Sequence, residues 1–254
     1  MRPYGGDFDY DAHGQGYARI RRPDPRIEAQ IHAALGDART VLNVGAGAGS
    51  YEPSDRHVVA IEPSAVMRAQ RPRDRAPAVA AFAEALPLDD GAVDAAMALM
   101  TVHQWSDLPK GLSELRRVSA GPVLVMAADQ EALGRFWLND YAPELFEAKR
   151  RRYPPIAEIV RHIGAAAEIR TILIPLDCTD GLASAFYGRP ESFLDPAVRA
   201  AQSSWRFVPE GVEERFVAAL TADLASGRWD DRYGRLRTQP TFAGALRLVI
   251  GWPA

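Results

Sequence analysis

A short apolar run that leads directly into three glycines is the feature that most constrains how this chain can fold. The run covers residues 41–44, and Gly45, Gly47 and Gly49 follow it at every second position. β-Branched and aliphatic residues favour a buried strand. Glycine has no Cβ, so it accepts a positive φ and lets a ligand approach the main chain closely. The stretch therefore predicts a buried strand that ends in a ligand-binding glycine turn.

A carboxylate follows the next apolar run of the sequence. Residues 58–61 are apolar, and Glu62 comes directly after them. An acid at the tip of the second strand of a doubly wound α/β sheet can accept hydrogen bonds from the two ribose hydroxyls. The glycine turn and Glu62 together indicate a cofactor that contains adenosine. The dinucleotide fingerprint G-x-G-x-x-G would need its third glycine at Ser50, whereas this chain has it at Gly49.

The G-x-G-x-G spacing followed by Glu62 resembles motif I and the acid after it in class I S-adenosylmethionine-dependent methyltransferases. Residues 81–90 look like the adenine-side segment of that family, residues 93–100 like its fourth strand, and residues 112–118 like the helix before its fifth strand. The resemblance extends from about residue 38 to residue 128. It implies an α/β fold with a Rossmann-like, doubly wound seven-stranded sheet whose last strand is antiparallel. It also implies S-adenosylmethionine as the cofactor and methyl transfer as the activity.

The sequence departs from the family after the glycine turn. Only residues 50–57 separate Gly49 from the second predicted strand, and Pro53 lies among them. Most members of the family have a helix of several turns there, whose N-terminus faces the methionine end of the cofactor. We expect a single helical turn or none in this chain.

The other apolar patterns predict the remaining elements of a methyltransferase core. Strands are expected at residues 41–44, 58–61, 79–82, 95–100, 122–128, 168–175 and 245–251, and helices at residues 24–36, 64–70, 108–118 and 156–163. Residues 1–23 are expected to form an arm over the cofactor cleft, and residues 24–177 and 241–254 the core. Residues 178–240, between the sixth and seventh strands, are expected to form an inserted helical cap. Its aromatic side chains could form a pocket roof or its own small core.

The resemblance implies which residues bind the cofactor. An aromatic ring and a guanidinium from the arm suit the sulfonium and the carboxylate of the methionine part. The strand tips supply the rest of the set. The predicted residues are Tyr10, Tyr17, Arg21, Gly45, Ala46, Gly47, Gly49, Glu62, Pro63, Met67, Ala83, Glu84, Ala85, Leu99 and Met100. A solvated surface role is the alternative for the three arm residues and for Glu84.

Polar and aromatic residues after the fourth and fifth strands predict the reaction centre. His103 follows the fourth strand, where a histidine could remove a proton from the acceptor. Tyr141 is the second choice for this base. The predicted acceptor-binding residues are His103, Trp105, Trp137 and Tyr141. Trp105 as a core residue and His103 as a structural histidine stay open as alternatives.

Composition restricts the partners of the chain. The formal net charge of −3 over 254 residues gives no broad attraction to nucleic acid or to an anionic membrane. The basic run at residues 149–152 is interpreted as the solvated face of a helix. The single cysteine excludes an intrachain disulfide, and no spacing indicates a metal site. With no apparent signal peptide or spanning segment, we expect a cytoplasmic monomer or homodimer without nucleic-acid or membrane partners.

Two other functions remain open from the sequence. The chain could be an inert S-adenosylmethionine-binding homologue or an NAD-dependent oxidoreductase. The glycine spacing argues against the oxidoreductase, and His103 argues against the inert homologue, because binding alone needs no proton acceptor. The fourth strand is not followed by an Asn-Pro-Pro-Tyr motif, which by resemblance argues against nucleobase amino groups or glutamine as acceptors. A small, partly apolar metabolite is the expected methyl acceptor.

Overall fold

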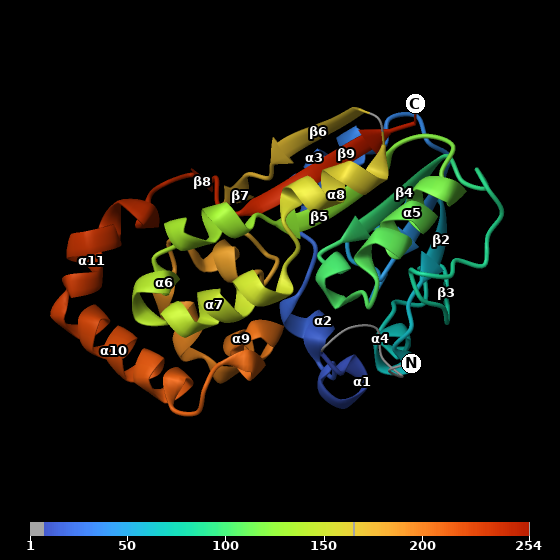
Figure 1. Cartoon of the computed structure of the whole chain (residues 1–254). Helices are drawn as coiled ribbons and strands as arrows, with labels where there is room; N and C mark the ends of the chain where they lie inside the picture. Colours follow the sequence, from blue (N-terminus) through green and yellow to red (C-terminus); the bar gives the residue numbers. More distant parts are fainter. Residues whose placement is uncertain (1–7, 165, 254) are drawn as a thin grey trace.

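A mixed β-sheet forms the centre of the computed structural model, which describes residues 8–164 and 166–253 (Figure 1). Within these residues, seven strands form one sheet in the order β3-β2-β1-β4-β5-β9-β6. Strand β9 runs antiparallel to both of its neighbours, and the other pairs are parallel. The strands are β1 (Thr40–Val44), β2 (His57–Ile61), β3 (Ala78–Val79), β4 (Ala95–Leu99), β5 (Val123–Ala128), β6 (Ala166–Thr171) and β9 (Leu246–Trp252). The predicted doubly wound sheet with an antiparallel last strand is confirmed.

Helices cover both faces of this sheet, as Figure 1 shows for α3 on one side and for α5 and α8 on the other. Alternate residues of β5 enter two separate hydrophobic clusters. Leu124 belongs to the cluster that contains Ile27 and Ile31 of α3 (Pro25–His32). Val123 belongs to the cluster that contains residues of α5 (Leu108–Val118) and α8 (Ile156–Ile163), such as Leu112. Burial on both faces explains why the sequences of β4 and β5 are apolar throughout.

A helical cap lies beside the sheet (Figure 1, left). Strands β7 (Ile174–Pro175) and β8 (Thr241–Phe242) pair where the chain enters and leaves the predicted insert. The cap interior is aromatic: the ring of Trp137 lies 5.5 Å from that of Trp229 and 5.7 Å from that of Phe193. These rings belong to the same hydrophobic cluster as the α3 face of the sheet, so the core continues from the sheet into the cap. The helices of the insert are α9 (Pro196–Ala200), α10 (Val212–Ser226) and α11 (Arg228–Tyr233). Helices α6 (Leu138–Tyr141) and α7 (Pro143–Arg152) belong to the predicted core segment but pack against the insert, so from here on the cap includes them.

The arm lies across the carboxyl ends of the strands through two short helices, α1 (Tyr10–His13) and α2 (Tyr17–Ile20). Asp11 of α1 accepts hydrogen bonds from the Ser64 hydroxyl (2.5 Å) and from the backbone of Val66 (3.0 Å) at the start of α4 (Ala65–Ala69). Arg21 forms an ion pair with Asp180 of the insert, with 2.6 Å between Nε and Oδ1. The arm is therefore fixed to both the core and the cap. The predictions for residues 1–7 lie outside the described residues.

Several short elements and boundaries complete the fold. Within the described residues no helix lies between β1 and β2, which agrees with the prediction of one turn or none. The predicted sixth strand at residues 168–175 is wrong as one element, because β6 ends at Thr171 and the chain then leaves the sheet to form β7 at the cap. The third strand is shorter than predicted, since residues 80–82 do not continue β3. The 3-10 helices are Ala33–Leu35, Val102–Gln104, Gln130–Arg135, Ala183–Phe186, Pro190–Leu194, Ser203–Phe207 and Gly234–Arg237.

Candidate active site

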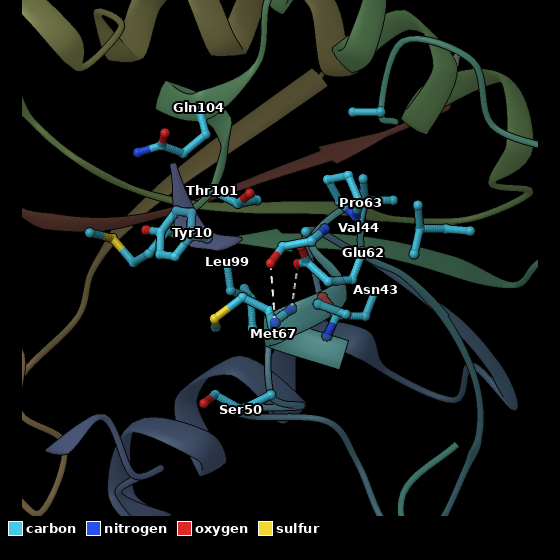
Figure 2. Close-up of a pocket in the computed structure, with 18 of the residues that line it drawn as sticks. Tyr10, Asn43, Val44, Ser50, Glu62, Pro63, Met67, Leu99, Thr101 and Gln104 are labelled. Atoms are coloured by element: carbon cyan, nitrogen blue, oxygen red, sulfur yellow. Dashed lines mark hydrogen bonds between the residues drawn. The ribbon is translucent and has the colours of Figure 1, made fainter. Parts of the chain in front are cut away.

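A pocket opens at the carboxyl ends of β1, β2 and β4, where the order of the strands reverses direction. Open α/β sheets bind ligands at this position. We call it the first pocket. Figure 2 shows Gln104, Thr101 and Tyr10 on one side of it and Glu62 and Pro63 on the other. Its walls also include Phe8, Tyr17, Arg21, Asn43, Val44, Gly45, Ala46, Gly47, Ala48, Ser50, Tyr51, Met67, Ala83, Glu84, Leu99, Met100 and Trp105.

The glycine turn has the conformation that its sequence predicts. Gly45, Gly47 and Gly49 have φ values of 68°, 52° and 90°, a region that favours glycine. A Cβ on Gly45 would lie 2.1 Å from the Oγ1 of Thr101, so no side chain fits there. Gly45 and Gly47 line the first pocket, whereas Gly49 does not. Gly49 therefore allows the backbone conformation of the turn but forms no part of the pocket wall. Its predicted contact with the cofactor is not supported.

A buried ion pair supports the turn from behind. Arg71 and Glu52 are both buried, with 2.8 Å between Nη2 and Oε2. The side-chain amide of Asn43 donates to the other oxygen of Glu52 at 3.0 Å. This network links β1, the loop before β2 and the end of α4. The network was not predicted from the sequence, because its members are far apart in the chain.

Glu62 lies at the tip of β2 with its carboxylate directed at the turn. Its Oε2 accepts a hydrogen bond from the backbone N–H of Gly47 (2.8 Å), and its Oε1 accepts one from the backbone N–H of Ser64 (2.9 Å). Burial raises the pKa of this carboxyl, against the lowering effect of the two backbone donors. Each carboxylate oxygen keeps a lone pair that can accept a further hydrogen bond. Glu62 is therefore placed to bind a ligand hydroxyl as well as to hold the turn.

Gln104 provides a test of whether the first pocket fits S-adenosylmethionine. Its side chain is 6% exposed, and neither its amide oxygen nor its amide nitrogen has a hydrogen-bond partner among the described residues. Burying an amide without hydrogen-bond partners costs free energy. We therefore expect a polar group of the ligand to form hydrogen bonds with it. The amino and carboxylate groups of the methionine part offer a donor and an acceptor. Together with Glu62 and the glycine turn, the residues fit the cofactor that the sequence predicts.

The three predicted residues on the adenine side differ in their surroundings. Ala83 and Glu84 line the first pocket, whereas Ala85 does not. The Oε1 of Glu84 accepts hydrogen bonds from the backbone N–H of Ser106 (2.7 Å), its hydroxyl (2.8 Å) and the N–H of Asp107 (3.1 Å). Glu84 thus fixes the loop before α5, and its contact with adenine stays a prediction.

The predicted arm residues Tyr10, Tyr17 and Arg21 all line the first pocket. The Nη1 of Arg21 donates to the Tyr17 hydroxyl at 2.7 Å, while its Nε is held by Asp180. Asp180 also accepts a hydrogen bond from the Tyr51 hydroxyl at 2.7 Å. The charge of Arg21 is therefore already balanced within the protein, which leaves it less available than predicted for a ligand carboxylate. Burial raises the pKa of Tyr10, so its phenol stays protonated.

A second pocket adjoins the first on the side of the cap. Tyr10, Tyr17, Arg21 and Met100 line both pockets. Met100 has a φ of 55°, which is strained for a residue with a side chain and is typical of functional sites. The other walls are mainly apolar and come from β5, α7, the insert and β9. They include His103, Leu133, Phe136, Phe146, Lys149, Tyr153, Leu182, Ser184, Gln202, Ser204 and Phe242.

The structure separates the two candidates that follow β4. His103 lines the second pocket, and its ring packs edge-on against that of Tyr153, with 4.5 Å between the ring centroids. Trp105 lines the first pocket instead and packs against Gly111, where a Cβ would lie 2.5 Å from the indole. Trp105 was predicted to bind the acceptor, and this prediction is corrected: the residue forms part of the wall of the first pocket.

Trp137 and Tyr141 do not line either pocket, and their predicted roles as acceptor-binding and catalytic residues are corrected. The indole N–H of Trp137 donates to the backbone carbonyl of Tyr187 at 2.9 Å. The hydroxyl of Tyr141 donates to Asp223 at 2.8 Å inside the cap, and burial raises its pKa further above the ordinary value. Both side chains are buried because the chain after β5 turns into the cap, whose interior they fill.

Lys149 is a functional candidate that was not predicted from the sequence. It is buried and lines the second pocket, although residues 149–152 were expected to be solvated. Leu145 and Phe146 precede it at helical spacings of four and three, and both are buried. This spacing places Lys149 on the apolar face of α7, and it is the signal that could have identified the residue.

The described residues hold no group of three or more His, Cys, Asp or Glu side chains that could bind a metal ion. Over the same part of the chain, no helix is long and apolar enough to span a bilayer.

Comparison with known proteins gives matches to methyltransferases. Residues 42–125 match a family model described as a methyltransferase domain. A crystal structure of a methyltransferase from an antibiotic biosynthesis pathway of Anabaena variabilis is 30% identical, and the match covers 91% of this chain and 98% of that chain with a TM-score of 0.83. A SAM-dependent methyltransferase from Thermotoga maritima is 15% identical over 96% of this chain and 97% of its own, with a TM-score of 0.55, and shares the fold. No curated protein matches the chain.

Proposed function

Because the chain belongs to the class I S-adenosylmethionine-dependent methyltransferases, we propose that it methylates a small molecule bound in the second pocket. Its cofactor, S-adenosylmethionine, supplies a methyl group on a positively charged sulfur. The observation that carries the proposal is the shared wall of the two pockets, formed by Tyr10, Tyr17, Arg21 and Met100. A shared wall lets the chain hold two reactants side by side, which is the main requirement of a displacement reaction.

The walls of the second pocket support a small and partly apolar acceptor. Leu133, Phe136, Phe146 and Leu182 give it large apolar surfaces, and residues of the arm and the cap form parts of its wall. Apolar walls also reduce the access of water, which favours transfer to the bound acceptor. The Anabaena protein, described as part of an antibiotic biosynthesis pathway, is consistent with a small-molecule acceptor for this chain as well.

We propose His103 as the base that removes the acceptor proton. It lines the second pocket and not the first, so it would meet the acceptor rather than the adenosine. A histidine accepts a proton near neutral pH, and general-base assistance contributes about 10² to 10⁴ in rate. An acceptor that reacts through a carbon or a thiolate already activated in solution would not need this base.

The test is transfer of label from methyl-labelled S-adenosylmethionine to a pool of small metabolites, with the labelled product identified by mass spectrometry. With the acceptor known, His103→Ala should lower kcat by about 10² to 10⁴ and leave the affinity for S-adenosylhomocysteine unchanged. His162→Ala, a histidine on the outer helix α8, is the matched control. Label found only on protein or nucleic acid would contradict the small-molecule proposal, and wild-type kcat in His103→Ala from pH 6 to 9 would contradict the base.

A further inference from the structure

Lys149 places a buried positive charge on the wall of the second pocket. Its side chain is 7% exposed, and no described carboxylate lies within ion-pair distance of its ammonium group. The two acidic residues of α7 form ion pairs with other residues: Glu144 pairs with Arg215 at 2.7 Å and Glu147 with Arg150 at 3.5 Å. A buried charge without a counterion destabilises a fold, so it requires a partner from outside the described chain or a functional reason.

The surroundings of Lys149 compensate its charge only in part. Its Nζ lies 5.2 Å from the centroid of the Phe146 ring, a cation–π distance. Burial lowers the pKa of Lys149 to about 8, and the positive charge of Arg152, one turn further along α7, adds to this effect. The lysine therefore remains mostly protonated at neutral pH.

The described lining of the second pocket is positive overall. It contains the cations Arg21 and Lys149 and no aspartate or glutamate, and its His103 is neutral when it acts as the proposed base. Asp180 balances the charge of Arg21, whereas no described acid balances Lys149. Hydroxyl and amide groups of residues such as Ser204 and Gln202 add neutral hydrogen-bonding capacity on the cap side. A ligand with an apolar body and one negative charge would complement these walls.

We propose that Lys149 binds a carboxylate of the methyl acceptor, so that the substrate is a small organic acid with an apolar body. This inference rests on the proposed function, since it assigns the second pocket to the acceptor. Lys149 then anchors and orients the acceptor, while the base at His103 acts on a different group of the same molecule.

The experiment compares acids with their uncharged amides of nearly the same shape. The complex of the enzyme with S-adenosylhomocysteine is titrated calorimetrically with phenylacetate and phenylacetamide, and with cinnamate and cinnamamide. A charged hydrogen bond to Lys149 should make at least one acid bind about tenfold more tightly than its amide. The preference should fall to less than about twofold in Lys149→Met and should persist in Arg151→Met, which removes an exposed charge from the same helix.

Several outcomes would overturn the proposal. They are the absence of acid preference in every pair with the wild-type enzyme, its persistence in Lys149→Met, or its loss in Arg151→Met. The first outcome needs no variant, and Lys149→Gln replaces the methionine variant if the latter does not fold. Binding of S-adenosylhomocysteine in the same titrations separates the two proposals, because tight cofactor binding without acid preference rejects only the role of Lys149. If acids bind as proposed but no labelled product forms, the methyl-transfer proposal fails instead.

Discussion

At the scale of single residues, Glu62 combines a structural and a ligand-binding role. Its carboxylate holds Gly47 and Ser64 through their backbone N–H groups and still faces the first pocket. Glu62→Ala should weaken binding of S-adenosylhomocysteine by about 2 to 4 kcal/mol, because charge-assisted hydrogen bonds lose their acceptor. Calorimetric titration measures the loss, with Asp55→Ala as a control on an exposed carboxylate. Unchanged affinity in Glu62→Ala would remove this residue from the cofactor site.

Lys149 permits a prediction about stability and pH. Its pKa in the folded protein is about 8, below the ordinary 10.5, so the folded state binds fewer protons than the unfolded state between these two values. The free energy of unfolding therefore rises as pH increases from about 8 towards 10.5, as far as it depends on Lys149. Burial of the charged ammonium group costs most below pH 8. Lys149→Met should accordingly raise the free energy of unfolding at pH 7, by up to about 3 kcal/mol, and by less at pH 10.

Urea unfolding of the wild type and of Lys149→Met at pH 7 and pH 10 measures this difference. Arg151→Met serves again as the control, since an exposed charge should change stability little at either pH. If Lys149→Met is less stable than the wild type at pH 7, the ammonium group stabilises the fold. This result would contradict the view of Lys149 as a charge without a counterion.

At the scale of elements, the glycine turn depends on both backbone conformation and space. Gly47 has a positive φ, and a Cβ there would lie 3.3 Å from the end of Met67, so the protein alone leaves some room. A valine would be strained at this φ, and its methyl groups would extend into the first pocket. Gly47→Val should therefore weaken cofactor binding more than Glu62→Ala does. Gly134→Ala, where an added Cβ meets nothing within 4 Å and φ is not positive, is the matched control.

Calorimetry with S-adenosylhomocysteine and thermal unfolding separate the two effects in Gly47→Val. A variant that is folded and binds as tightly as the wild type would show that the turn does not contact the cofactor.

At the scale of the whole molecule, the Arg21–Asp180 ion pair and a backbone hydrogen bond from Gly181 to Ile20 join the arm to the insert beside the two pockets. Asp180 of the insert is buried, the side chain of Arg21 of the arm is 13% exposed, and Tyr51 beside the glycine turn donates a hydrogen bond to the same carboxylate. Cofactor binding should therefore slow amide hydrogen exchange in residues 8–23 and 178–240 as well as in the strand tips, as expected for a closing lid. Asp180→Asn should reduce this protection in the arm, because the arginine loses its counterion.

Hydrogen exchange followed by mass spectrometry, with and without S-adenosylhomocysteine, measures this effect. Asp177→Asn is the control, since Asp177 is exposed and pairs with Arg26 outside the pockets. Protection confined to residues 41–105 would show that neither the arm nor the cap responds to the cofactor.

The sequence alone determined the features whose chemistry lies in consecutive residues. The strand, the glycine turn and Glu62 were predictable because a buried strand, a positive φ and a strand-tip acid each leave a local pattern. The shortened connection after Gly49 could be deduced from its length. The antiparallel last strand was implied by family resemblance rather than by any local pattern.

Tertiary structure alone decided which side chains form the second pocket. Trp137 and Tyr141 follow a strand tip in the sequence, but both side chains are buried in the aromatic interior of the cap. Lys149 belongs to a basic run, yet the packing of α7 buries it while Arg150 and Arg151 remain in solvent. Which residues of a helix are buried depends on what packs against it, and for α7 these partners are distant in sequence. The Arg21–Asp180 and Arg71–Glu52 pairs likewise arise only when the fold brings separate segments together.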